Sequence, residues 1–309
     1  MPRQSQSNKA IVILGGGRGL ASVLRALRNH GGDLTVIVSI AYDQGQDSGA
    51  SAPAPPAGLS MEDLRRALES LSGEEGALVR AIKRPLTIER LGKQPLGNLV
   101  IASVASAFGD YGTASRWLGE QLGITGAVLP ATTQPVPREI KTVEESPGTS
   151  GRSSGVAAKC LSFPSEQVEA PAATVEAIGR ADWVLLAPGS LYRSLLSAAA
   201  VPDVTAALTR TRARVVWIAN LEPASCETAS TSGIDHLRAL RRHGVRADVV
   251  LHDPSATLKF DTSELEAYGI RSVTRGLRSR ADKSLHDPTK LGAILAGMIA
   301  SSAGDAVRG

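Results

Sequence analysis

The feature that most constrains this chain is residues 10–30, where a short apolar run ends in a cluster of glycines and an amphipathic helix follows. The run AIVIL at residues 10–14 has the length and composition of a buried β-strand. Apolar residues then recur at i, i+3, i+4 and i+7 from Leu20, which predicts one buried helix face. A helix N-terminus directs N–H groups and partial positive charge at one point. The segment therefore predicts a strand–turn–helix unit with a candidate anion site at the turn.

The turn itself contains Gly15, Gly16, Gly17 and Gly19 in the order G-G-G-R-G-L. It is not a strict dinucleotide fingerprint, because Leu20 stands at the third glycine position, and no G-K-[ST] follows to make a nucleotide-hydrolase phosphate loop. A tight turn that needs positive φ angles is one explanation. We favour a phosphate cradle, because four glycines in five positions are more than a turn requires.

A second unit of the same kind lies near the middle of the chain. Residues 183–187 (WVLLA) predict a buried strand, and Gly189, Ser190 and Tyr192 lie between it and a helix that runs to Ala199. In an open α/β sheet, ligands bind at the carboxyl ends of the strands. Two glycine junctions in one sheet therefore predict a bipartite site for a ligand that carries phosphates.

Other polar residues also follow predicted strands. Asp43 comes after the strand at 34–40 and can bind a metal ion or a ribose hydroxyl, or hydrogen-bond its own loop. Thr132 and Thr133 follow the strand at 127–130, where their hydroxyls can orient a ligand or simply end the strand. Asn220 follows the strand at 215–219 in the same way.

The remaining pattern predicts one α/β domain over residues 1–309, with a Rossmann-like, doubly wound, mostly parallel sheet and a small helical subdomain. The helical lobe is predicted at about 59–124, where Ser60 caps a helix and Trp117 anchors the core. Flexible loops are predicted at about 44–58 and 147–155, since both are rich in small residues or proline.

Composition excludes several classes of protein. No run of 18 apolar residues occurs and the N-terminus is polar, so neither a membrane span nor secretion is expected. The two cysteines form no C-x-x-C motif, which fits a reduced cytoplasm. The net charge of +4 is small and only 3% of residues are aromatic, so we expect no nucleic-acid partner. Two Asp–His neighbour pairs, at 235–236 and 252–253, are read as structural.

The order of several motifs resembles the YvcK/CofD-like family, which includes gluconeogenesis factors and, more distantly, 2-phospho-L-lactate transferase. The similarity covers about residues 9–298. The motifs that carry it are LGGGRGL, LGNL, VLPATTQPV, ADWVLLAPGSLYRSLL and LHDPTKL. This chain has Arg18 where the family usually has Thr, Tyr42 in place of the first Asp of a pair, and Gln94-Pro95 where a His usually stands nearby. The changes lie in loops that follow strands.

The resemblance implies a cytoplasmic regulatory protein that binds a nucleotide sugar such as UDP-N-acetylglucosamine and is linked to cell-wall synthesis and carbon metabolism. It also implies a homodimer and, at Asp43, a Mg²⁺ ligand. The ligand-binding residues that it implies, with Arg18 added as a direct phosphate contact, are Gly15, Gly16, Gly17, Arg18, Gly19, Asn98, Thr132, Thr133, Gly189, Ser190, Tyr192 and Asn220.

Two alternatives stay open at this point. One is a CofD-like Mg²⁺-dependent transferase that moves a phospho-organic-acid group from a nucleotide diphosphate donor to a deazaflavin-like acceptor. The other is a nicotinamide-dependent oxidoreductase, which the broken G-x-G-x-x-G pattern and the missing Tyr-x-x-x-Lys dyad make the weakest of the three. The regulatory hypothesis needs no catalytic base, and the sequence offers no clear candidate for one.

Overall fold

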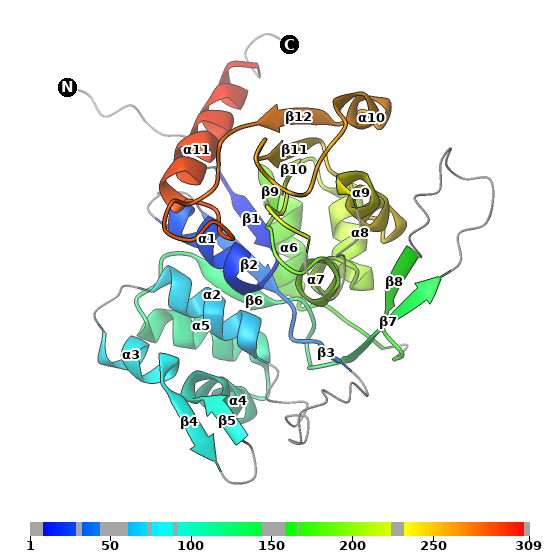
Figure 1. The fold of residues 1–309 in the computed structure, drawn as a ribbon. Helices are drawn as coiled ribbons and strands as arrows, with labels where there is room; N and C mark the ends of the chain where they lie inside the picture. The colour runs from blue at the N-terminus through cyan, green and yellow to red at the C-terminus, as the bar shows by residue number, and fades with distance from the viewer. Residues whose placement is uncertain are drawn as a thin grey trace.

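The centre of the molecule is a seven-stranded β-sheet in which every strand runs parallel to its neighbours (Figure 1). The computed structural model describes residues 9–28, 33–43, 61–72, 76–88, 92–143, 158–165, 167–223 and 232–305. Across the sheet the strands are β12 (Arg271–Thr274), β11 (Val249–His252), β10 (Arg214–Ile218), β9 (Trp183–Leu186), β1 (Ile11–Leu14), β2 (Leu34–Val38) and β6 (Ala127–Pro130). The predicted α/β fold is confirmed.

The strand order reverses once, between β1 and β9. From β1 the chain moves outward to β2 and β6, and it then returns to β9 on the other side of β1 before it continues to β10, β11 and β12. In doubly wound sheets such a reversal leaves a crevice at the carboxyl ends of the two central strands, where ligands bind. Both predicted glycine junctions follow these two strands.

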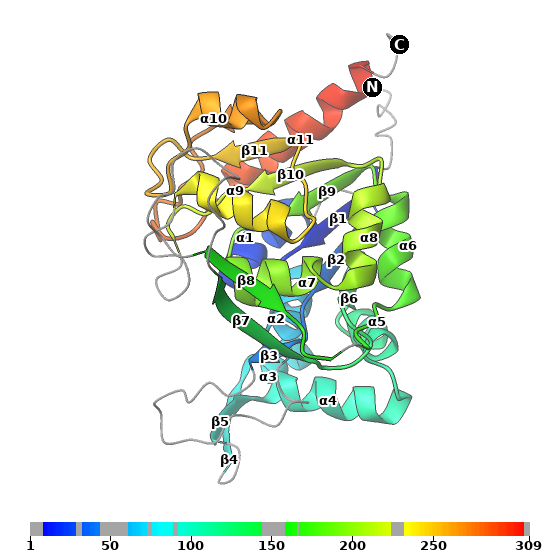
Figure 2. The ribbon, with the colours of Figure 1, turned by 90° about the vertical axis from the view of Figure 1, so that its right-hand side faces the viewer.

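Helices cover both faces of the sheet because the strands are apolar on both sides (Figures 1 and 2). In β1, Ile11 and Ile13 pack with α1, α2 and α11, whereas Val12 and Leu14 pack with the helices of the opposite face. The first set is α1 (Gly17–Leu27), α2 (Glu62–Leu71) and α11 (Pro288–Asp305); the second is α6 (Ala172–Arg180), a π-helix (Leu191–Leu196), α7 (Ser197–Ala199), α8 (Pro202–Arg210) and α9 (Gly233–Arg242). A short helix, α10 (Thr262–Ala267), precedes β12 at the edge of the sheet.

The described residues from α2 to α5 form a lobe at one end of the sheet, and this lobe is not purely helical (Figure 1). Besides α2 it contains α3 (Ala77–Lys83), α4 (Leu96–Phe108), α5 (Tyr111–Gln121) and an antiparallel hairpin of β4 (Pro85–Ile88) and β5 (Gly92–Pro95). The prediction that Trp117 anchors the core is wrong. Its side chain is 41% exposed on α5 and lies against Phe108, with 6.1 Å between ring centroids.

A small second sheet, which the sequence did not predict, packs beside the π-helix. It consists of β3 (Tyr42–Asp43), β7 (Pro137–Val143) and β8 (Ala158–Ser162). The strand β7 pairs in parallel with β3 and antiparallel with β8. The flexible loops predicted at 44–58 and 147–155, and the helix cap predicted at Ser60, lie outside the described residues.

Helix starts signalled by capping residues are confirmed where the structure describes them. Ser232 and Asp235 form a reciprocal capping box at the start of α9, and the Asp287 carboxylate accepts hydrogen bonds from the first-turn amides of α11. Among the described residues, no helix combines the length and apolar character that crossing a membrane would take.

Candidate functional site

The two glycine junctions touch each other at the point where the strand order reverses. A Cβ built on Gly19 would lie 2.1 Å from the carbonyl oxygen of Pro188, and one on Gly189 would lie 2.8 Å from the carbonyl oxygen of Gly16. Neither distance leaves room for a side chain, so these backbones approach closely only because both residues are glycine. The sequence-predicted juxtaposition of the two junctions is therefore confirmed.

Asn220 holds the second junction in place from the end of β10. Its Oδ1 accepts a hydrogen bond from the Gly189 N–H at 2.8 Å, and its Nδ2 donates to the Gly189 carbonyl at 2.7 Å. This two-point contact fixes the peptide unit on either side of the turn. Asn220 thus lies at the candidate site, where it positions Gly189.

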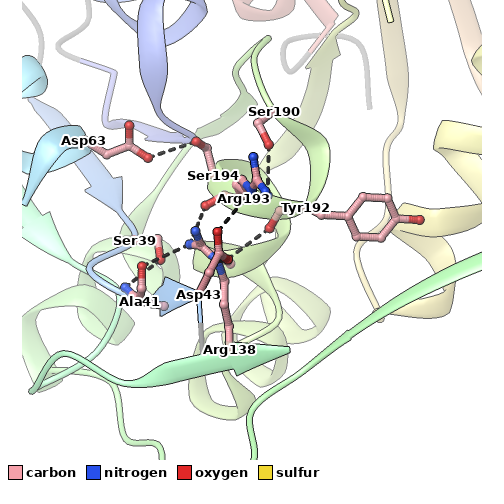
Figure 3. Close-up of polar contacts among 10 residues, drawn as sticks. Ser39, Ala41, Asp43, Asp63, Arg138, Ser190, Tyr192, Arg193 and Ser194 are labelled. Carbon is pink, nitrogen blue, oxygen red and sulfur yellow. Dashed lines mark hydrogen bonds and ion pairs between the residues drawn. The ribbon is translucent and has the colours of Figure 1, made fainter. Parts of the chain in front are cut away.

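The sequence predicts an anion at the N-terminus of α1. In the structure, the side-chain carboxylate of Asp63, a residue of α2, lies at this position. The Gly17 N–H donates to Asp63 Oδ1 at 2.7 Å, and the Ser194 hydroxyl donates to Oδ2 at 2.9 Å (Figure 3). Burial raises the pKa of this carboxyl above its ordinary value, although these hydrogen bonds and the charge of Arg138 act in the opposite direction. Asp63 lies three residues after Ser60, at the capping-box position of the predicted helix, and this local explanation is the only one that the sequence suggests for it. Its role at the junction was therefore missed.

Close packing or a positive φ angle explains why each of these positions in the first junction is glycine. A Cβ on Gly16 would lie 2.0 Å from Asp63 Oδ2, and one on Gly15, which has φ +150°, would lie 2.9 Å from the Cβ of Ala187. Gly17 has φ +67° and open space around its Cβ position. The number of glycines alone therefore does not point to a phosphate. Gly15, Gly16, Gly17 and Gly19 remain predicted ligand contacts.

Arg18 lies between Gly17 and Gly19 in the first turn of α1. Its side chain is 66% exposed, and its Nη1 lies 3.9 Å from a carboxylate oxygen of Asp282. Such an exposed, long ion pair contributes little to stability. The predicted contact between Arg18 and a ligand phosphate remains a prediction.

Two arginines that sequence reasoning missed surround Asp43 (Figure 3). Asp43 Oδ1 accepts from Arg138 Nε at 2.7 Å, and its Oδ2 forms an ion pair with Arg193 Nε at 3.1 Å. The Arg138 side chain is 9% exposed, against 33% for Arg193. Arg138 lies in β7, where the sequence pattern is loose. Arg193 lies inside the motif ADWVLLAPGSLYRSLL, but within a helical apolar run, and sequence reasoning did not single it out there.

Arg138 also supports the π-helix that carries Arg193. Its Nη1 lies within hydrogen-bond distance of three acceptors: the carbonyls of Ala41 and Arg193, at 3.0 and 2.7 Å, and the hydroxyl of Ser197, at 3.1 Å. A π-helix is rare and its wider turn needs such outside support, and π-turns are frequent at functional sites. Ser190 caps the start of this helix, and its Oγ accepts a hydrogen bond from the Arg193 N–H at 2.9 Å.

The surroundings of Asp43 do not fit the predicted Mg²⁺ ligand. Both of its carboxylate oxygens lie against guanidinium groups, and Mg²⁺ prefers several oxygen ligands and no nearby cations. Within the described part of the chain, no group of three or more His, Cys, Asp or Glu side chains is placed to hold a metal ion. We therefore derive no chemistry through a metal at this position.

Two of the predicted ligand contacts have side chains directed elsewhere. Asn98 lies in α4 of the lobe, is 4% exposed, and accepts a hydrogen bond from Arg65 Nε at 3.2 Å. Tyr192 is buried, and its hydroxyl donates to the Lys159 carbonyl in β8 at 3.0 Å; Figure 3 shows its ring pointing away from Asp43. The structure does not bring these two side chains to the glycine junctions.

The two threonines after β6 make local contacts, Thr132 within its own turn and Thr133 with the segment that precedes α6. The Thr132 hydroxyl donates to the Gln134 carbonyl at 2.7 Å, and the Thr133 N–H donates to the Glu169 carbonyl at 2.9 Å. In the sheet, β6 is separated from β1 by β2. Any ligand contact from Thr132 or Thr133 would therefore come from two strands away and remains a prediction.

Comparison with known proteins identifies the family. A family model described as 2-phospho-L-lactate transferase CofD matches residues 11–277. A gluconeogenesis factor from Bacillus subtilis is 28% identical over 94% of this chain and 98% of its own length, and one from Halalkalibacterium halodurans is 31% identical over 94% and 96%. A relative of the same name from Deinococcus radiodurans is 31% identical over 92% of this chain, which spans only 65% of that protein.

Solved structures agree with the fold. A crystal structure of a Bacillus halodurans protein superimposes with a TM-score of 0.78 at 25% identity and covers 94% of this chain and 99% of that one. Another crystal structure, described as a UPF0052 family member from the same organism, gives a TM-score of 0.77 at 24% identity and covers 93% and 98% of the two chains.

Proposed function

The chain belongs to the family described as 2-phospho-L-lactate transferase CofD, and we propose that it acts as a regulatory protein of the gluconeogenesis-factor type that binds a nucleotide sugar. The ligand that we propose is UDP-N-acetylglucosamine or a close analogue. The proposed cellular role links cell-wall synthesis to carbon metabolism. It requires recognition of the ligand, without turnover.

The observation that carries this proposal is the contact between the two glycine junctions at the reversal of strand order. The turn at Gly17 and the turn at Gly189 meet there, with Asn220 bonded to the second. Crevices of this kind at the carboxyl ends of central strands bind nucleotides in doubly wound folds, which supports a ligand with a diphosphate. The names of the relatives support the regulatory class.

The experiment that tests this function is calorimetric titration of the purified protein with UDP-N-acetylglucosamine, with and without Mg²⁺, with UDP and NAD as comparison ligands. Saturable binding at micromolar concentration that needs no metal is the expected result. Absence of binding to any uridine nucleotide would overturn the proposal. Preference for NAD would instead favour a dinucleotide ligand.

The description of the matching family model supports a second candidate, a transferase of phosphorus-containing groups. It would move a phospho-organic-acid group from a nucleotide diphosphate donor to a deazaflavin-like acceptor. Incubation with a panel of activated donors and acceptors distinguishes the two functions, because the regulatory protein yields no product. A new phosphodiester product would establish the transferase.

A further inference from the structure

The two junctions of the proposed site differ in charge. At the first, the Asp63 carboxylate already accepts the hydrogen bond of the Gly17 N–H. A phosphate placed at the same helix end would lie within a few ångströms of this carboxylate, and two like charges at that distance repel each other. The first junction is thus a poor place for the anionic part of a ligand while Asp63 stays bonded there.

The second junction is close to two guanidinium groups. Arg138 and Arg193 share the carboxylate of Asp43, and the charge of Arg138 also acts on Asp63. Arg138 is buried and hydrogen-bonded to the carbonyl of Arg193 in the π-helix, to the hydroxyl of Ser197 in α7, and to the carbonyl of Ala41, which precedes β3. Arg193, whose side chain is 33% exposed, is the most exposed of the three side chains.

The position of Arg193 suits an anion in two further ways. It lies in the first turn of a helical segment that starts after Ser190 and continues into α7, and a helix N-terminus carries partial positive charge. Its guanidinium is oriented through Nε by Asp43, and the planar fork of an arginine matches the oxygens of a phosphate or carboxylate. Charge, exposure and orientation therefore coincide at this side chain.

We propose that Arg193 determines which ligands this site accepts, by binding the anionic group, a phosphate of the nucleotide, at the second junction. Asp43 and Arg138 position its guanidinium, and Asp63 disfavours an anion at the first junction. This inference rests on the proposed function for the identity of the nucleotide. The contact between Arg193 and a phosphate can be tested separately.

The test is calorimetric titration of Arg193→Ala and Arg193→Gln with UDP, inorganic pyrophosphate and uridine. Arg210→Ala, which removes an exposed arginine at the end of α8, is the control for net charge. We expect both Arg193 variants to bind UDP and pyrophosphate about tenfold to a hundredfold more weakly, as loss of a charge-assisted hydrogen bond predicts, while the affinity for uridine stays the same. If Arg193 had only a structural role, its replacement would lower the affinity for all three ligands together.

Several outcomes would overturn the inference. The inference would be wrong if the unaltered protein did not bind pyrophosphate. It would also be wrong if the Arg193 variants bound pyrophosphate with the same affinity as the unaltered protein. A larger loss in Arg18→Ala than in the Arg193 variants would place the phosphate at the first junction instead. The Gln variant, with melting curves for all variants, separates loss of binding from loss of folding. If pyrophosphate binding depends on Arg193 but no uridine nucleotide binds, the inference stands and the proposed function fails.

Discussion

Replacing Gly19 by alanine tests the conclusion that packing between the two junctions, and not a ligand, requires this glycine. The new methyl group would lie 2.1 Å from the carbonyl oxygen of Pro188 and 3.1 Å from the backbone nitrogen of Gly189. Ordinary contact needs more than 3 Å, so the junctions must separate by about 1 Å. Because the obstacle is backbone, no side-chain rotation can relieve it.

The expected cost follows from two contributions. Overpacking of a close contact costs about 1–3 kcal/mol. Separation of the junctions also strains the two hydrogen bonds between Asn220 and Gly189, which contribute about 1 kcal/mol each. We therefore expect Gly19→Ala to lower the free energy of unfolding by about 3–5 kcal/mol, measured by urea denaturation followed by circular dichroism.

Two other glycines provide matched controls in the same assay. Gly17→Ala meets no atom within 4 Å but must adopt φ +67°, so it should cost about 1–2 kcal/mol. Gly179→Ala lies in α6 with open space around its Cβ, and it should stabilise the protein by about 0.5–1 kcal/mol. If Gly19→Ala costs no more than Gly17→Ala, the packing explanation is wrong.

Three further predictions concern hydrogen-bonded side chains. The unaltered protein should lose stability as pH rises from 4 to 7, because Asp63, whose folded pKa is raised above 3.8, opposes folding as it ionises. Asp63→Asn lacks this ionisation and should become more stable relative to the unaltered protein over the same range. Urea titrations at several pH values measure the difference. Asp253 has the opposite sign. Burial acts against ionisation, but hydrogen bonds from Ser255 and from the backbone amides of Leu277 and Arg278 outweigh it and lower the pKa to about 2. Asp253→Asn should therefore be less stable than the unaltered protein at neutral pH, and this difference should be lost progressively as pH falls from about 4 to 2 in the same titrations. Tyr192→Phe should cost about 1 kcal/mol through its lost bond to Lys159 and leave the affinity for UDP unchanged in calorimetry; a large affinity loss would return Tyr192 to the ligand site.

The sheet and its two central junctions could be predicted because their signals are local. Four-residue apolar runs such as those at β1 and β9 have no polar face, which only a strand covered on both sides tolerates. The helix that follows β1 shows clear 3.6-residue periodicity. The place where two such units meet then follows from the rule for parallel sheets, without knowledge of any contact.

The charged part of the candidate site could not be predicted, since its members are far apart in the sequence. Arg138 and Asp43 lie 95 positions apart, and Asp63 and Ser194 lie 131 positions apart. Each of these residues has an ordinary local explanation, such as a helix cap or a solvated surface charge. Only the fold shows that guanidinium groups lie beside Asp43, where a metal was predicted, and that the Asp63 carboxylate lies at the helix end where a phosphate was predicted.

Trp117 shows another reason why a prediction from sequence can fail. Its helix, α5, is bounded by strong signals, among them the cap at Asp110, but the helix packs on its neighbours through small residues and Leu118. A large aromatic side chain has the greatest apolar area to bury, which makes the core its usual place. Here that area lies on the outer side of the lobe beside Phe108.

The pairing of β1 with β9 has a consequence for synthesis of the chain. Ile11 lies opposite Trp183, so the two central strands are separated by more than half of the sequence. Strands far apart in sequence pair late, because a long loop must close first. A chain leaving the ribosome therefore exposes one side of β1 until β9 emerges, and a fragment that ends before β9 would lack the second glycine junction. Any binding activity must await the second half of the molecule.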